Sequence, residues 1–315
     1  MPMSHAKVIV NPVAGGGSIR RQWPRICSQL HELDLSFDYE FTKSTGHAIE
    51  IAKQALDAGY EYLIAVGGDG TVNEVANGIL NSAHSDETVL GIISTGTACG
   101  FARSLGIRQN SAGSFSLLVS QGRTIIDACV VEYQNHRQQL RRFFVNEASI
   151  GFGAAVVNTW KRLPNCFGHT VNYKLRTTAS YIALLTHQNK MVELRIDNEN
   201  EGICACYLVV ANGQYFADRM QIAPHATLDD GLMNLVTIGN VSKSELLRIV
   251  PTVYDGSHIG HPKIRERQAR VIKVECADRL LIEADGEILG ECPASFWVIP
   301  SALTVVVLEP DILVS

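Results

Sequence analysis

Long apolar stretches are missing from this 315-residue sequence. Its longest uninterrupted apolar run, residues 203–211, is far shorter than the about 20 residues that a helix needs to cross a bilayer. Positive charge is also scarce, because 27 Lys and Arg residues stand against 32 Asp and Glu, for a net charge of −5. Nucleic-acid-binding domains usually carry a basic surface, so we expect no nucleic-acid partner. The N-terminus has no signal-peptide pattern, and we expect a cytoplasmic protein.

The cysteine pairs of metal sites and disulfide frameworks are absent too. The 8 cysteines include no Cys-x-x-Cys pair, which argues against zinc and favours buried thiols in a reducing compartment. Low-complexity segments and internal repeats are not found. With 46% hydrophobic and 19% charged residues, the chain is typical of a globular protein rather than a disordered one.

The first part of the chain alternates strand-like and helical patterns. Strands are expected at 7–10, 35–41, 62–66 and 89–94, and amphipathic helices at 48–56 and 72–80, with a further helix opening near Thr97. Thr71 and Glu74 have capping-box spacing, which predicts the start of the second helix. Strands that alternate with amphipathic helices predict an α/β domain with a doubly wound parallel sheet.

After about residue 125 strands follow strands, which favours a mostly antiparallel β-sandwich domain. The expected strands are 125–133, 142–150, 191–196, 203–211, 232–238, 271–275, 280–284, 295–299 and 303–308. Helices are expected at 153–163, 171–187 and after Ser242, which forms a capping-box pattern with Glu245. We expect one domain at 1–125, a second at 126–300, and a C-terminal segment, 301–315, that returns to the first. The default ligand site is the cleft between two such domains.

The strongest chemical signal is the run Gly67-Gly68-Asp69-Gly70-Thr71-Val72-Asn73 between a buried strand and an amphipathic helix. Glycines let a backbone approach an anion closely, and the free N–H groups of a helix start favour phosphate. A carboxylate at Asp69 beside phosphates requires a cation between them. An ordinary glycine-rich turn with a solvated aspartate is the alternative.

Two more turns of small residues follow strands in this part, Asn11–Gly17 and Thr95–Gly100. Three turns at one edge of a parallel sheet can enclose a nucleoside triphosphate. The Walker pattern and the protein-kinase catalytic loop are both absent. A phosphate site would therefore use backbone N–H groups and the hydroxyls of Thr71 and Thr97.

These residues resemble the diacylglycerol kinase-like lipid kinases, in particular the soluble bacterial branch related to sphingosine and ceramide kinases. The resemblance covers nearly the whole chain. It rests on Asn11-Pro12, Gly67-Gly68-Asp69-Gly70-Thr71, Gly96-Thr97 followed by Phe101-Ala102-Arg103, Val210-Ala211-Asn212-Gly213, Ala223-Pro224-His225-Ala226, Leu228-Asp229-Asp230-Gly231-Leu232 and Asp285-Gly286-Glu287.

The resemblance implies a nucleotide-binding first domain and a lipid- and metal-binding second domain. It implies that ATP contacts Asn11, Thr42, the loop 67–73 and Thr97. A structural Mg²⁺ is implied at the Asp230 carboxylate and the backbone carbonyls of Thr227 and Leu232.

Glu287 matches the family's proposed general base for the lipid hydroxyl, which makes Glu287 and Asp69 the expected catalytic residues. Asp127 matches the acidic residue of the family's aspartate–water–magnesium network, and we group Asp285 with it. A carboxylate within reach of an alcohol suits phosphoryl transfer, which otherwise needs positioning and charge neutralisation. A plain β-turn joining two strands is the alternative for residues 285–287.

Two departures from the family pattern are present. Cys99 and Gly100 stand where bacterial members usually have Asn-Asp, which removes an acidic residue from the nucleotide side. Gly17 stands where many members carry a lysine, with Arg20 and Arg21 just beyond. These arginines either meet anionic groups or form the solvated face of a helix.

The expected activity is transfer of the γ-phosphoryl group of ATP to a hydroxyl of diacylglycerol or a related lipid. A kinase acting on NAD is one alternative, since NAD kinases share the Gly-Gly-Asp-Gly-Thr run and Asn146-Glu147 imitates their Asn-Glu pair. A non-catalytic nucleotide-binding regulator is the other.

A membrane lipid as substrate implies transient, peripheral contact with an anionic bilayer. Lys161, Arg162, Lys174 and Arg176, interleaved with aromatic residues, are the expected basic group for that contact, although ordinary amphipathic helices explain them as well. The sequence leaves the acceptor lipid and the oligomeric state open, and a homodimer is among the states that it allows.

Overall fold

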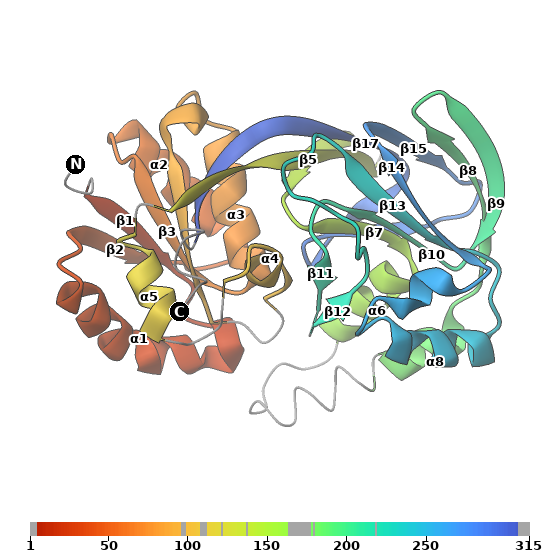
Figure 1. Ribbon diagram of the computed structural model, residues 1–315, viewed down its shortest axis with the longest axis horizontal. Helices are drawn as coiled ribbons and strands as arrows, with labels where there is room; N and C mark the ends of the chain where they lie inside the picture. The colour runs from red at the N-terminus through yellow and green to blue at the C-terminus, as the bar shows by residue number, and fades with distance from the viewer. Residues whose placement is uncertain are drawn as a thin grey trace. The chain divides into compact units, whose positions relative to one another are not determined.

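The computed structural model describes residues 5–95, 99–107, 112–120, 122–136, 138–162, 178, 180–217 and 219–307 (Figure 1). The strands are β1 (Ala6–Val10), β2 (Phe37–Phe41), β3 (Tyr62–Gly67), β4 (Val89–Ser94), β5 (Arg123–Asn135), β6 (Gln138–Phe144), β7 (Glu147–Gly151), β8 (Lys190–Ile196), β9 (Glu199–Ala205), β10 (Tyr207–Ala211), β11 (Tyr215–Phe216), β12 (Met220–Gln221), β13 (Met233–Ile238), β14 (Ile264–Ala269), β15 (Val271–Glu275), β16 (Leu281–Ala284) and β17 (Glu287–Val306). The helices are α1 (Ala14–Glu32), α2 (His47–Asp57), α3 (Asp69–Leu80), α4 (Gly100–Ser104), α5 (Ala112–Leu117), α6 (Phe152–Lys161) and α8 (Lys243–Thr252), with 3₁₀ turns at Ser85–Glu87 and Ser257–Gly260. In the part of the chain that is described, no helix has the length and apolar character needed to span a bilayer.

The chain divides into two units, the first made of the described residues within Met1–Ala128 and Pro300–Ser315 and the second of Cys129–Ile299. In the first unit, parallel strands lie in the order β2-β1-β3-β4, followed by the C-terminal end of β17. Strand β3 is buried along its whole length, as a strand covered on both faces should be. Ile51, Ala52, Ala55 and Leu56 form the buried stripe of α2. The predicted parallel α/β fold is confirmed.

The second unit is antiparallel and sandwich-like, as predicted. One sheet has the order β14-β13-β10-β7-β16 and continues into the first part of β17. Strands β9, β8 and β15 pair in turn and reach β17 from the other side, and β6 pairs with β5. The core between these layers includes Phe144, Ile150, Leu235, Ile272 and Phe296.

The opposite face of the β10–β13 sheet carries a second core under helices. Tyr207, Val209 and Val236 pack there with Leu184, Leu246 and Ile249. Leu184 belongs to a helical segment, 180–186, and Leu246 and Ile249 belong to α8. The expected helix at 171–187 is thus helical at 180–186, while 171–177 lies outside the described residues.

Several expected strands have other limits. The run 142–150 is split, because β6 ends at Phe144 and β7 begins at Glu147. The run 203–211 is split at Cys206, where the chain leaves β9, paired with β8, and enters β10, paired with β7 and β13. Conversely, the strand expected at 295–299 and residues 303–306 of the strand expected at 303–308 belong to the single long strand β17, while residue 308 lies outside the described residues. Periodicity marks apolar stretches well, but it does not show where a chain changes its partner.

Helix starts also differ in part. The capping box at Ser242 is confirmed, since the Ser242 side chain accepts from the Glu245 backbone and Glu245 accepts from the Ser242 backbone. The capping box expected at Thr71 is wrong, because α3 begins earlier, at Asp69, and its N-cap, Gly68, has no side-chain cap hydrogen bond. Strand β14 and helix α5 were not expected from the sequence, whereas α1 contains the helical position considered for Arg20 and Arg21.

Candidate functional site

The carboxyl ends of four parallel strands meet at one edge of the first unit's sheet. In register, Val10 of β1 lies beside Phe41 of β2 and Val66 of β3. Gly67 at the end of β3 lies beside Ser94 at the end of β4. The turns that follow these strands therefore converge, as predicted, on the edge where open α/β sheets bind ligands.

Backbone and side-chain hydrogen bonds hold these turns together. The Asn11 amide donates to the Thr71 hydroxyl over 2.9 Å, and the Thr42 N–H donates to the Val10 carbonyl over 2.8 Å. The Thr95 N–H donates to the Gly67 carbonyl over 2.9 Å. Asn11 and Thr71 thus serve as partners for each other across the site.

Gly67 is required by close packing. A Cβ atom at residue 67 would lie 2.4 Å from the Thr71 hydroxyl oxygen, so a side chain there would push α3 away from β3. At Gly70 a Cβ would meet nothing within 4 Å, so there is open space beside the first turn of α3. That turn presents the N-terminal end of a helix with no side-chain cap, which is a favourable place for an anion.

The turn expected at Asn11–Gly17 is part of the kinked start of α1. Gly15, Gly16 and Gly17 have φ values of 59°, 69° and 81°, a left-handed path that side chains rarely adopt. Arg20 and Arg21 lie on the following helical turn and are exposed.

Asp69 uses both carboxylate oxygens within the first unit. Its Oδ2 accepts from the Gly100 N–H over 3.0 Å, and its Oδ1 accepts from the Phe101 N–H over 3.2 Å. Burial raises the pKa of Asp69, and the backbone N–H groups at the start of α4 partly oppose that rise. Asp69 therefore anchors α4 to the first turn of α3.

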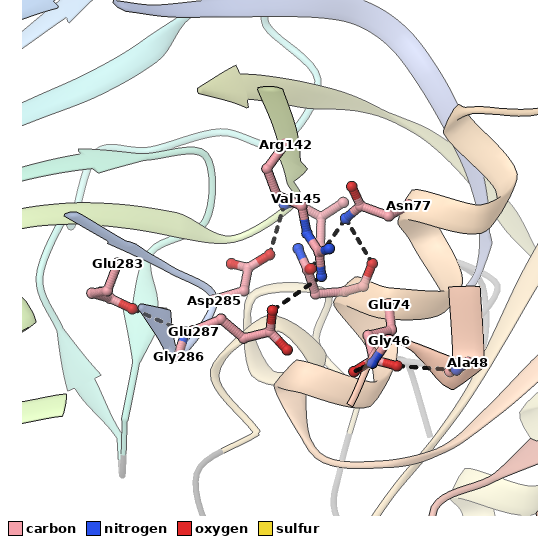
Figure 2. A network of polar contacts seen from close by, with 11 residues as sticks. Gly46, Ala48, Glu74, Asn77, Arg142, Val145, Glu283, Asp285, Gly286 and Glu287 are labelled. Carbon is pink, nitrogen blue, oxygen red and sulfur yellow. Dashed lines mark hydrogen bonds and ion pairs between the residues drawn. The ribbon is translucent and has the colours of Figure 1, made fainter. Parts of the chain in front are cut away.

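Glu74 is a site residue whose role the sequence did not reveal. It is 7% exposed, and its carboxylate accepts from the Gly46 N–H over 2.8 Å and from the Ala48 N–H over 3.1 Å (Figure 2). Gly46 is the N-cap of α2 and has φ of 83°. Glu74 thus caps the neighbouring helix, and it secures the loop that follows Thr42 at the sheet edge.

The other expected nucleotide contacts differ in their surroundings. Val72 and Asn73 are buried, and Asn73 accepts from the Asn77 amide through both its side chain and its backbone carbonyl. Gly68 is partly exposed. Thr97 lies outside the described residues.

In the second unit, Asp285 and Gly286 form the two-residue turn between β16 and β17. Their φ values of 46° and 84° are both positive, the pattern of a type I′ hairpin turn. Asp285 is 4% exposed, and its carboxylate accepts the backbone N–H groups of Val145, Asn146 and Glu147 over 3.0, 3.2 and 2.9 Å. These bonds occupy the break between β6 and β7, which explains why the expected strand 142–150 is interrupted.

Glu287 follows this turn directly. Its Oε2 lies 3.1 Å from the Arg142 guanidinium of β6, and the two side chains are 18% and 19% exposed (Figure 2). Tyr133 of β5 is close enough for both charges to act on it, while burial chiefly raises its pKa. The Glu287 carboxylate is therefore accessible but held in place. No motif marked Arg142 as a site residue, because it lies within an expected strand.

Asp127 has a structural partner in the first unit. It is 1% exposed, and its Oδ1 accepts from the Ser301 N–H over 2.8 Å. Ser301 has φ of 51°, so this bond supports a left-handed position in β17. Its expected place in a metal network stays a prediction.

The expected magnesium ligands lie in one loop of the second unit. Asp230 Oδ1 accepts from the Leu232 N–H over 3.0 Å, and Oδ2 accepts from the Gln268 amide over 3.1 Å. One exposed carboxylate with the carbonyls of Thr227 and Leu232 is an all-oxygen donor set, which fits a hard cation that keeps several waters. Among the described residues, no three His, Cys, Asp or Glu side chains form a metal-binding group, and the cysteines are free.

Of the expected basic group, Lys161 ends α6 and is exposed, as is Arg162. Lys174 and Arg176 lie outside the described residues.

Comparison with known proteins identifies both parts of the chain. The family model of the diacylglycerol kinase catalytic domain matches residues 5–131, and that of the YegS C-terminal NAD kinase beta sandwich-like domain matches residues 146–307. The diacylglycerol kinase of Staphylococcus haemolyticus (strain JCSC1435) is 30% identical over 295 residues, which cover 92% of this chain and 84% of that protein.

Solved structures share the fold. A diacylglycerol kinase from Bacillus anthracis str. Sterne has a TM-score of 0.72 at 21% identity and covers 99% of both chains. Yeast NADH kinase complexed with NADH has a TM-score of 0.56 at 11% identity, over 98% of this chain and 84% of that one. Since the sandwich-like domain spans half of the chain and a curated relative matches almost all of it, the chain belongs to the diacylglycerol kinase-like family of lipid kinases.

Proposed function

We propose that this enzyme transfers the γ-phosphoryl group of ATP to a hydroxyl of diacylglycerol or a closely related lipid. Curated relatives of nearly full length are named diacylglycerol kinase, which supports this acceptor class. The observation that carries the catalytic part is Glu287, a partly exposed carboxylate held by Arg142 on a rigid turn.

ATP would bind at the edge of the first unit's sheet. The left-handed glycines of the first turn, the uncapped start of α3 and the open space at Gly70 support a phosphate site made of backbone N–H groups. Thr42, Asn11 and Thr71 would line it, with Gly67 and Gly68 allowing close approach. Thr97, Val72 and Asn73 remain expected contacts.

Glu287 would act as the general base. Phosphoryl transfer needs little covalent help, so removal of the hydroxyl proton at the right place is the main chemical task left to the protein. The lipid hydroxyl would donate a hydrogen bond to the Glu287 carboxylate. Arg142 would hold this carboxylate in position while it accepts the proton.

Asp69, Asp127 and Asp285 would support the site. Asp69 orders the start of α4, and Asp285 holds the backbone of 145–147 beside the Glu287 turn. A Mg²⁺ ion at Asp230, Thr227 and Leu232 would stabilise the loop of the second unit, and Mg²⁺ with ATP would neutralise phosphate charge. Contact with an anionic bilayer through Lys161 and Arg162 stays part of this proposal, as does a possible homodimer.

The test is a phosphoryl-transfer assay with labelled ATP, Mg²⁺ and mixed micelles of diacylglycerol, ceramide or sphingosine, and with NAD in a separate arm. We expect labelled phosphatidate-type product. Glu287→Gln should lower kcat by about 10²–10⁴-fold, the range of a lost general base, and leave ATP binding intact. Glu291→Gln, on the same strand and also paired with an arginine, is the matched control. Label on NAD alone would assign the chain to the nicotinamide kinases, and full turnover by the Glu287 variant would remove that residue from its role.

A further inference from the structure

Two buried glutamates lie next to the turn that carries Glu287. Glu283 of β16 is 2% exposed and Glu147 of β7 is 5% exposed. In register, Glu283 lies opposite Ser149, which is fully buried and two residues from Glu147 on the same face. The two carboxyl groups therefore meet in one layer of the sheet, and they hydrogen-bond to each other.

The hydrogen bonds decide where the proton lies. The Ser149 hydroxyl donates to Glu283 Oε1 over 2.7 Å. The Gly286 N–H donates to Glu283 Oε2 over 3.0 Å (Figure 2). Both oxygens of Glu283 thus act as acceptors, which suits the ionised form. A hydrogen bond between two carboxyl groups needs one proton, and the two hydrogen bonds that Glu283 already accepts favour Glu147 as the donor.

The turn at residues 285–286 is held by two sets of hydrogen bonds, one made by Glu283 of the pair and one made by Asp285. Glu283 holds the N–H of Gly286, the residue just before Glu287. Asp285 holds the backbone N–H of Glu147, and the Asp285 N–H donates to the Glu147 carbonyl over 2.9 Å. Glu147 therefore contacts both acidic residues that hold the turn. Its backbone bonds to Asp285, and its side chain bonds to Glu283.

We propose that Glu147 and Glu283 share a single proton and that this pair positions Glu287 for catalysis. The proposal rests on the proposed role of Glu287 as base. Both glutamate side chains are buried beneath the turn, so we assign them as positioning residues. When the shared proton is present, Glu283 is free to accept from Gly286; when it is lost, two buried negative charges repel and the turn shifts.

The groups that face the pair are few among the described residues. Ser149 donates to Glu283. Tyr207 of β10, whose own pKa is raised chiefly by burial, hydrogen-bonds Ser149 and is influenced by the charges of both glutamates. Lys161 of α6 is the cation that acts on Glu283. Burial of the Glu283 carboxyl group is the largest influence on its pKa, and it raises this pKa. The folded state thus holds a proton that the unfolded chain has released, and stability falls as pH rises above the ordinary glutamate range toward the raised value.

Steady-state kinetics over a range of pH would test the proposal. Glu147→Ala and Glu283→Ala should lower kcat on the order of 10- to 100-fold, as expected when a catalytic group is displaced, with KM for ATP unchanged. Glu147→Gln donates permanently to Glu283, so it should restore most of kcat. We expect kcat of the wild type to decline at alkaline pH and this decline to disappear in the Glu147→Gln variant. If Glu147→Ala keeps full kcat, or if Glu147→Gln keeps the alkaline decline, the proposal is overturned.

A second measurement does not depend on activity. The melting temperature of the wild type should fall with rising pH above the ordinary glutamate pKa, and Glu147→Gln should flatten this dependence. Glu275→Gln, an exposed strand residue of the same unit, is the control and should keep the wild-type slope. An equal slope in Glu147→Gln and wild type would contradict the shared proton. An active Glu287→Gln enzyme would instead contradict the base, while these melting curves would still report on the pair.

Discussion

At the scale of single residues, the carboxylate of Asp69 links two helices of the first unit. It lies in the first turn of α3 and accepts the N–H groups of Gly100 and Phe101 at the start of α4. From the sequence we expect the Asp69 carboxylate to face a cation beside phosphates. Its bonds in the structure show an anchor, and any contact with a cation would add to that role.

Replacement of Asp69 distinguishes these roles. Asp69→Ala should lower the free energy of unfolding by about 0.5–2 kcal/mol, the usual cost of a lost helix cap, because the start of α4 loses its acceptors. We expect kcat to fall with it. Urea unfolding and phosphoryl-transfer assays measure the two effects, with Asp86→Ala, exposed in the same unit, as control. Loss of activity with unaltered stability would favour a purely cation-facing aspartate.

Cys99 shows how a departure from the family pattern affects backbone energetics. It is the N-cap of α4, it is buried, and its φ of 47° lies in the left-handed region. Asparagine occupies that region more readily than cysteine does. A cysteine in this conformation therefore strains this helix start, and the Gly100 N–H next to it donates to Asp69.

At the scale of elements, helix α2 depends on a side chain from helix α3. The first turn of α2 has no side-chain cap of its own from Gly46, and Glu74 accepts the N–H groups of Gly46 and Ala48 instead. The negative charge also lies near the positive end of the α2 dipole. One glutamate thus ties together the two helices that follow β2 and β3.

Glu74→Ala should lower the free energy of unfolding by about 1–3 kcal/mol, because it leaves backbone N–H groups without their acceptor in a buried place. We also expect a higher KM for ATP, since the loop after Thr42 loses its support. Thermal or urea unfolding together with kinetics measures both. The control is Glu50→Ala, an exposed glutamate in the first turn of α2, which should have a much smaller effect. Equal losses in the two variants would contradict the role of Glu74 as a cap.

Element limits show what periodicity misses. The helices at 48–56 and 72–80 were predicted well because their apolar residues recur at helical spacing, although α2 buries one apolar stripe and α3 is buried continuously from Thr71 to Ile79. The break between β6 and β7 was missed, because its cause is Asp285, a residue more than a hundred positions away. The Ser242 capping box was predicted because both partners lie within one turn.

At the scale of the whole molecule, the loop with Asp230 offers a way to measure metal binding through overall stability. If Mg²⁺ binds there, a concentration of 100 times Kd should stabilise the protein by about 2.7 kcal/mol. Asp230→Ala should abolish this increase in melting temperature. Asp229→Ala, its exposed neighbour, should keep it. A Mg²⁺ effect that is the same in both variants would contradict the site.

The organisation of the chain followed from composition and rhythm. Alternating strands and helices predicted the parallel first unit, and successive strands predicted the antiparallel second unit. The chain comes back to the first unit near its end, where Thr304 and Val305 of β17 lie beside Val89 and Leu90 of β4. The apolar pattern of the sequence predicted a strand there, but only the strand pairing in the structure showed that β4 is its neighbour.

The amino-acid order alone determined the kinds of elements and the glycine-rich passage from strand to helix at 67–70, since these depend on residues close together in the chain. Tertiary structure decided which carboxylates hold which backbone groups. Glu74 reaches Gly46 across 28 residues and Asp285 reaches Val145 across 140. Such partners meet only when strands and helices pack, because a hydrogen bond depends on distance in space and leaves no periodic trace in sequence.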